Sequence, residues 1–168
     1  MHKWMRAFTL IELTVVLLII SLSLAVVCPR FTAGSDQLSL LRSSVNRIAS
    51  VAEYASQQAA CTRFMYFLNL DTQEGTYWVT SQKPDGQKVP VTDALSLKGQ
   101  LPDGVKFADV KIQGMNTHSQ GILVIRLSPQ GWADPAEIIL TCSTGETMSI
   151  MIDELSGQIE TCMTERLI

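Results

Sequence analysis

The chain opens with a short polar stretch and continues as a long apolar run, residues 8–27, in which the one acidic residue is Glu12. A helix over this run would be about 30 Å long, which matches the hydrocarbon core of a bilayer. The pattern therefore predicts a transmembrane helix at residues 8–28. Because Lys3 and Arg6 precede it without an acidic neighbour, the positive-inside rule places the start of the chain in the cytoplasm and the remainder across the membrane.

Glu12 is costly in such a helix, by about 3 kcal/mol on insertion scales, so we expect it to have a function and a cationic partner. Three other interpretations of the segment compete. They are a secretory signal cleaved after residues 23–25, a lipoprotein anchor at Cys28, and a plain membrane anchor. The charge of Glu12 argues against the first and third, and Val27 argues against the second because it is not a small residue.

A second helical pattern covers residues 36–60, after residues 32–35, where we expect a short interruption. Asp36 suits the cap of this helix. We assign residues 29–60 to an amphipathic helix that continues into the globular domain, and its alanines favour packing on a sheet over a coiled-coil contact. The apolar stripe, at steps of three and four residues, consists of Leu38, Leu41, Val45, Ile48, Ala52, Ala55 and Ala59.

Residues 61–168 show the sequence pattern of a β-rich domain, in which short strand-like runs are separated by turn residues. The last three expected strands are separated by short turn sequences and predict an antiparallel meander. Residues 81–104 are rich in proline and glycine and predict a long surface connection with one short strand. The expected strands are residues 64–70, 76–80, 105–112, 121–127, 137–142, 147–153 and 158–162. The pattern predicts an α+β fold, a long N-terminal helix packed on an antiparallel sheet.

Charge and composition argue against nucleic-acid binding and catalysis. The chain carries 13 basic and 16 acidic residues, a formal charge of −3, so we expect no nucleic-acid partner. Its two histidines are His2, which precedes the apolar run, and His118, which we expect in an exposed turn. We predict that the protein is not an enzyme and has no catalytic residues, metal site or cofactor.

The N-terminus resembles the class III leader of type IV prepilins and type II secretion pseudopilins. The resemblance rests on Ala7, where the family usually has glycine, on the letters FTLIEL that follow it, and on the apolar helix. It implies that a prepilin peptidase removes residues 1–7, cutting between Ala7 and Phe8, and methylates the new amino group of Phe8. It also implies that Glu12 neutralises the terminal amine of a neighbouring subunit during filament assembly, and that Pro29 kinks the helix.

The C-terminal half resembles the H-type minor pseudopilin domain, the GspH/FimT family. The resemblance rests on residues 122–131, on Gly145 between two strands, and on residues 156–159. It implies a minor subunit near the tip of the periplasmic pseudopilus of a type II secretion system, with a pilin-like fold. The implied partners are the prepilin peptidase, other major and minor pseudopilins, the inner-membrane assembly platform and inner-membrane lipid.

Two other functions also fit the sequence. The first is a FimT-like minor type IV pilin for pilus assembly or DNA uptake, against which the acidic residues 156–166 argue because phosphate contacts need exposed basic side chains. The second is an exported ligand-binding β domain on a pilin anchor. For the pseudopilin, we expect a single-pass inner-membrane protein with a cytoplasmic N-terminus and a periplasmic C-terminal domain.

The chain has four cysteines, and Cys28 falls at the membrane boundary. Export to an oxidising compartment would permit a disulfide among Cys61, Cys142 and Cys162. In a meander, Cys142 and Cys162 would lie on strands separated by a third, about 9 to 10 Å apart, which is too far for a bond. A bond from Cys61 to either of them, or no bond at all, remains open.

Overall fold

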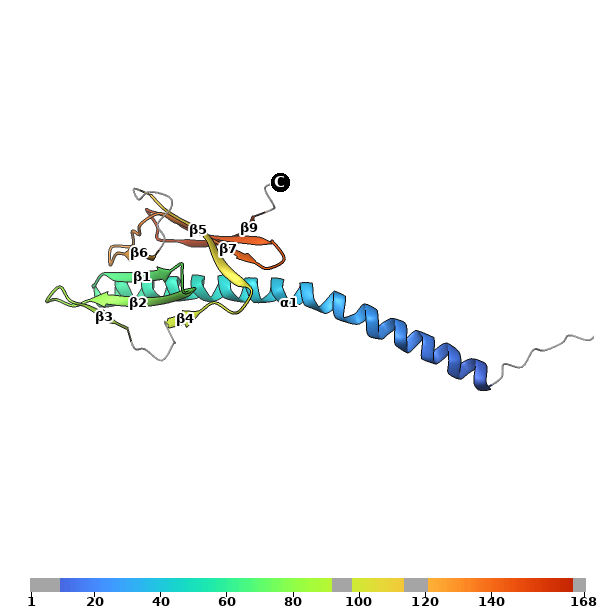
Figure 1. The fold of residues 1–168 in the computed structure, drawn as a ribbon. Coiled ribbons are helices and arrows are strands. Elements are labelled where there is room, and N and C mark those ends of the chain that lie inside the picture. Colours follow the sequence, from blue (N-terminus) through green and yellow to red (C-terminus); the bar gives the residue numbers. More distant parts are fainter. Residues whose placement is uncertain (1–9, 92–97, 114–120, 165–168) are drawn as a thin grey trace, which may run out of the picture. The chain divides into compact units, whose positions relative to one another are not determined.

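The computed structural model describes residues 10–91, 98–113 and 121–164 (Figure 1). The chain forms two compact units, residues 1–36 and 37–168. Helix α1 (Leu10–Thr62) begins in the first unit and supplies the central helix of the second.

Helix α1 is continuous where an interruption was expected. Residues 32–35 are helical, and Asp36 lies inside the helix instead of capping a new one, so both expectations are wrong. The stretch contains Gly34, but one glycine costs a helix only about 1 kcal/mol relative to alanine, which its neighbours can offset. The helix also runs through Pro29, and the kink expected there stays a prediction.

The second unit contains two antiparallel sheets. In the first, the strands follow the order β3-β2-β1-β6, and β4 also pairs with β2. In the second, the order is β5-β7-β8-β9. The strands of the first sheet are β1 (Tyr66–Asp71), β2 (Thr76–Gln82), β3 (Lys88–Pro90), β4 (Lys98–Gln100) and β6 (Ile122–Leu127). Those of the second are β5 (Val105–Ile112), β7 (Ala136–Cys142), β8 (Thr147–Ile152) and β9 (Ile159–Thr164).

All seven expected strands are present, with ends that differ by up to two residues, and the meander β7-β8-β9 is confirmed. The connection at residues 81–104 differs, because it contains two short strands, β3 and β4, which pair with opposite ends of β2. The long strand β2 leaves backbone groups unpaired on its outer side, and the two short strands satisfy them.

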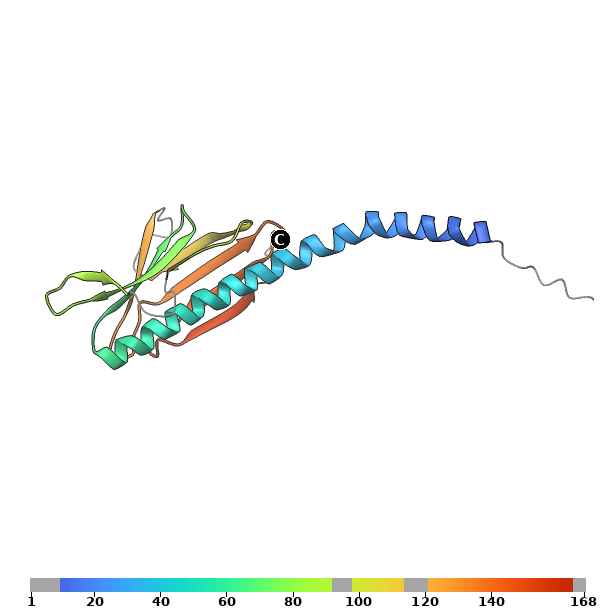
Figure 2. The same ribbon diagram turned by 90° about the horizontal axis from the view of Figure 1, so that it is seen from below.

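The apolar stripe of α1 forms the centre of the core. Six of its seven expected residues, from Leu41 to Ala59, are fully buried, and Leu38 is partly buried. The stripe packs against inward-facing residues of both sheets, among them Leu68 and Ile125 in the first sheet and Ile138 in the second. Figure 2 shows the helix running along the strands of the second sheet. The expected α+β fold, a long helix packed on antiparallel strands, is confirmed, and the strands form two sheets where one was expected.

Candidate functional site: the start of α1 and a groove between α1 and β4

Glu12 lies near the start of the described part of α1. Its neighbours Leu10, Ile11 and Leu13 are largely exposed, at 82%, 72% and 56%. The acid therefore stands on a helix surface that is apolar around it. Ala7 and Phe8, the predicted cleavage and methylation site, lie outside the described residues, as does His118.

The apolar surface continues along the first unit. Large exposed side chains follow one another with few polar residues between them. The hydroxyl groups of Thr14, Ser21 and Ser23 donate hydrogen bonds to backbone carbonyls one turn earlier in the helix. Among the residues that the structure describes, no helix is both long and apolar enough to cross a membrane. The exposed apolar residues are Leu10, Ile11, Leu13, Val15, Val16, Leu17, Leu18, Ile19, Ile20 and Leu22.

Cys61, Cys142 and Cys162 are free thiols in the structure. Cys142 and Cys162 lie on β7 and β9, with β8 between them, as the meander predicted. Cys142 is buried, and its sulfur lies 2.9 Å from the Thr144 hydroxyl, whereas Cys61 at the end of α1 and Cys162 are exposed. A disulfide among these three therefore stays a prediction.

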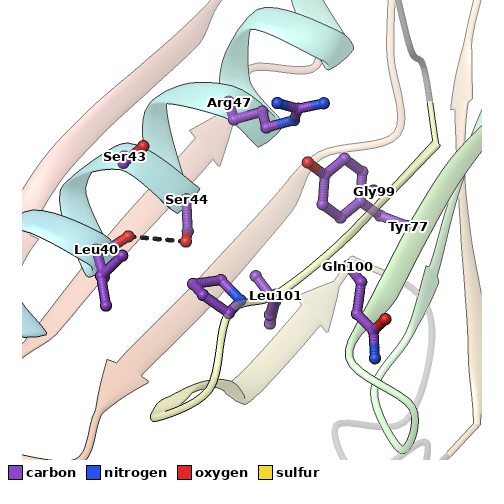
Figure 3. Close-up of a pocket in the computed structure, with 9 residues that line it drawn as sticks. Leu40, Ser43, Ser44, Arg47, Tyr77, Gly99, Gln100 and Leu101 are labelled. Atoms are coloured by element: carbon purple, nitrogen blue, oxygen red, sulfur yellow. Dashed lines mark hydrogen bonds between the residues drawn. The ribbon is translucent and has the colours of Figure 1, made fainter.

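The second unit has a groove of about 410 Å³ between α1 and the segment that begins at β4 (Figure 3). The helix contributes one side of the groove and the segment contributes the other, with Tyr77 of β2 between them. Both sides carry polar groups as well as apolar ones. The lining residues are Leu40, Ser43, Ser44, Arg47, Tyr77, Gly99, Gln100, Leu101 and Pro102.

Tyr77 and Gly99 fix the floor of this groove. They are cross-strand partners in the β2–β4 ladder, and a side chain at Gly99 would overlap the Tyr77 ring and hydroxyl. The glycine therefore lets the ring lie flat over the edge strand, an arrangement that stabilises a glycine in a sheet. Tyr77 is 2% exposed as a result.

Arg47 is the charged group of the groove. Figure 3 shows its side chain directed toward the Tyr77 hydroxyl. Burial raises the pKa of Tyr77 above its ordinary value, while the charge of Arg47 and its hydrogen bond to the phenol oxygen act in the opposite direction. The phenol is neutral at physiological pH, as a tyrosine with the ordinary pKa also is.

Residues 122–131, on which the second resemblance rests, form β6 and the turn that follows it. An ion pair stabilises this turn. Arg126 holds Asp134 through two nitrogens, at 2.8 to 3.1 Å, and its guanidinium lies 5.9 Å from the ring of Trp132. Burial opposes ionisation of Asp134, but the bonds from Arg126 outweigh it and lower the pKa of that carboxyl. The turn is tied to the β8–β9 turn, because Ala133 N–H donates to the Glu154 carbonyl at 3.1 Å.

The sequence did not indicate the groove. Arg47 falls on the polar side of the helical pattern, and Gly99 falls in a stretch interpreted as a surface connection. Their approach depends on the pairing of β4 with β2, which brings together residues far apart along the chain. Within the described ranges, no cluster of three histidine, cysteine or acidic side chains is arranged to hold a metal ion.

No protein-family model and no curated protein matches this chain. Solved structures do resemble it. Two are of the minor pseudopilin EpsH from the type 2 secretion system of Vibrio cholerae, with TM-scores of 0.60 and 0.64 and 9% identity. The matched region covers 73% and 76% of this chain and, in both cases, 96% of the EpsH chain. A third is the solution structure of E. coli GspH, with a TM-score of 0.57, 10% identity, and coverage of 77% of this chain and 92% of that one. The described chain therefore has the fold of the minor pseudopilin EpsH and of GspH.

Proposed function

We propose that the protein is an H-type minor pseudopilin, a structural subunit near the tip of the periplasmic pseudopilus of a type II secretion system. The observation that carries the proposal is the similarity of fold, which extends over 92% to 96% of EpsH and GspH. The first unit supports it independently, because its exposed apolar helix with one acid near the start fits a subunit that assembles through its helix.

The anchor is residues 8–28, with residues 1–7 as a cytoplasmic leader and the domain from residue 61 in the periplasm. A helix that is apolar on all sides is stable where lipid or other helices surround it. In this proposal, prepilin peptidase cuts between Ala7 and Phe8 and methylates Phe8, and the inner-membrane assembly platform receives the processed subunit. Pro29 is the position at which the helix can bend on leaving the bilayer.

Glu12 sets the position of the subunit in the filament. Its carboxylate pairs with the N-terminal amine of an adjacent pseudopilin while both groups lie in an apolar surrounding. In that surrounding the pair attracts strongly, and either charge left alone is heavily penalised. The pairing therefore discriminates between the correct axial register and any other without a catalytic step.

The experiment that tests the function is deletion of the gene in its host, followed by parallel assays of exoprotein release and DNA uptake. Loss of release with normal uptake, restored by the wild-type gene, supports the pseudopilin. Loss of uptake or of pilus formation with normal release overturns it in favour of a FimT-like minor pilin. The acidic residues Asp153, Glu154 and Glu160 around the β8–β9 turn favour the first outcome, since they would repel a phosphate backbone.

A further inference from the structure

The groove beside α1 carries a charge that its own lining does not neutralise. Among the described residues that line it, Arg47 is the charged one, and none is acidic. The ion pairs Lys111–Glu137 and Arg126–Asp134, both between described residues, do not involve Arg47. The groove therefore presents a cation together with the exposed Ser43 hydroxyl, and the buried Tyr77 lies beneath them.

The guanidinium lies next to a fixed aromatic residue. Figure 3 shows the Arg47 side chain directed toward the Tyr77 hydroxyl, and the Tyr77 ring is itself packed against Gly99. The planar guanidinium has five N–H donors, which can match the two oxygens of a carboxylate. The geometry therefore suits a carboxylate better than a bulky or apolar group.

The other end of the groove is apolar. Leu40, at 36% exposed, lies seven positions before Arg47 on α1, so the two are about 10 Å apart along the helix. Leu101 faces it from the other side. Pro102 also lines the groove. A matching segment would present an apolar side chain and an acidic one at about that spacing, for example two turns apart on a helix.

We propose that this groove binds an acidic side chain of a neighbouring pilin-like subunit, with Arg47 as its partner and the Leu40 end as its apolar contact. The proposal rests on the proposed function, since it places a second subunit alongside α1. It adds a specific charge pair outside the membrane segment to the pairing at Glu12. Charge pairs of this kind set the partner and the register more than the total affinity.

The test is photo-crosslinking of the full chain in its host, alongside the other subunits of the machine. A benzophenone amino acid is placed at Ser43, which is exposed at the rim, and, as the control, at Asn46, which is exposed on α1 but outside the groove lining. The expected result is a crosslink from position 43 to a pilin-like subunit, mapped by mass spectrometry to a segment that contains an aspartate or glutamate. Crosslinks equal at both positions, to lipid alone, or to a segment without an acid would overturn the proposal.

The second part of the test exchanges the charges of Arg47 and of its acidic partner. Arg47→Glu should lower the crosslink yield at least about tenfold, and arginine at the partner's acidic position should restore it. Arg42→Glu on the same helix, which contacts Met163 instead, should leave the yield within about twofold. A yield unaffected by Arg47→Glu, or no restoration by the exchange in variants whose thermal unfolding is unchanged, sinks the proposal.

Exoprotein release is measured in the same strains. Suppose that both the wild-type gene and the Arg47→Glu gene restore release, and that the crosslink is unchanged in the variant. The groove proposal then fails, while the pseudopilin function stands. If the wild-type gene has no effect on release, the proposed function itself fails.

Discussion

The Tyr77 ring lies over Gly99, its cross-strand partner, and occupies the space that a side chain at Gly99 would need. This contact joins the short edge strand β4 to β2 and also forms the floor of the groove in which Arg47 lies. The same glycine thus serves both the packing of the sheet and the shape of the surface.

Gly99→Ala should destabilise the protein by about 1–3 kcal/mol, since the new methyl group displaces the Tyr77 ring and the surrounding core has no room for it. The measurement is the free energy of unfolding of the full chain in detergent, from urea denaturation. Gln100→Ala on the same strand is the matched control, because Gln100 is exposed and its truncation should change stability by less than about 0.5 kcal/mol. Equal losses in the two variants would contradict the packing argument.

Neighbouring alanines at the end of α1 provide a second matched pair. Ala59 is fully buried, whereas Ala60 is exposed. Ala59→Leu should destabilise the chain by about 1–3 kcal/mol because the helix packs closely on the sheets there, and Ala60→Leu should be nearly neutral. Thermal unfolding of both variants checks this, and an equally stable Ala59→Leu protein would show that the helix is not tightly packed at that point.

The helix stripe and the strands could be predicted because their signals are local. Leu41, Val45 and Ile48 share one face at helical spacing, and the alternating burial of β5 follows directly from its residues. The fold class followed from the same patterns.

The assembly of the strands into two sheets depends on distant pairs and has no local signal. Leu68 pairs with Ile125 across β1 and β6, and Tyr77 pairs with Gly99 across a stretch that is rich in turn residues. Core packing chooses these partners, so neither the second sheet nor the groove could be predicted. The residues at 32–35 locally favour a break in the helix. The helix nevertheless continues through them, because its continuous hydrogen bonding outweighs this local preference.

The pair between Arg126 and Asp134 should make stability depend on pH. The pKa of Asp134 is lower in the folded chain than its ordinary value of 3.8, so the unfolded chain binds the proton more readily. The stability from this pair is therefore fully present above about pH 3.8 and is lost as the pH falls through the lower folded value.

The comparison of wild type with Asp134→Asn tests this dependence. The difference in unfolding free energy should be constant from neutral pH down to about pH 4.5 and should shrink below pH 3.8. Arg126→Gln should reduce the same acid-dependent difference, because it removes the partner. Urea titrations from pH 3 to 7 measure it, and a difference that stays the same over this range would contradict the assignment.

The thiols should differ in reactivity according to their burial. Cys61 and Cys162 are exposed and should be alkylated quickly in the native protein, whereas buried Cys142 should react only as fast as the domain opens. Peptide mass spectrometry after timed labelling measures each site separately. Protection of Cys61 or Cys162 that a reductant removes would instead reveal one of the disulfides that the sequence permits.

The last prediction concerns Glu12. Glu12→Ala should still insert and be processed, because the apolar helix is unchanged, but it should fail to join the filament and reduce incorporation at least about tenfold, since the neighbouring amine loses its countercharge. Thr14→Ala is the control on the same exposed segment, because its hydroxyl bonds to the chain's own Ile11 carbonyl at 2.8 Å. Intact mass of the membrane-extracted protein checks processing, with Phe8 as the expected terminus, and crosslinking to other pseudopilins checks incorporation. Normal incorporation of correctly processed Glu12→Ala would remove Glu12 from the assembly mechanism, whereas a terminus near residue 26 would replace the prepilin leader with an ordinary signal peptide.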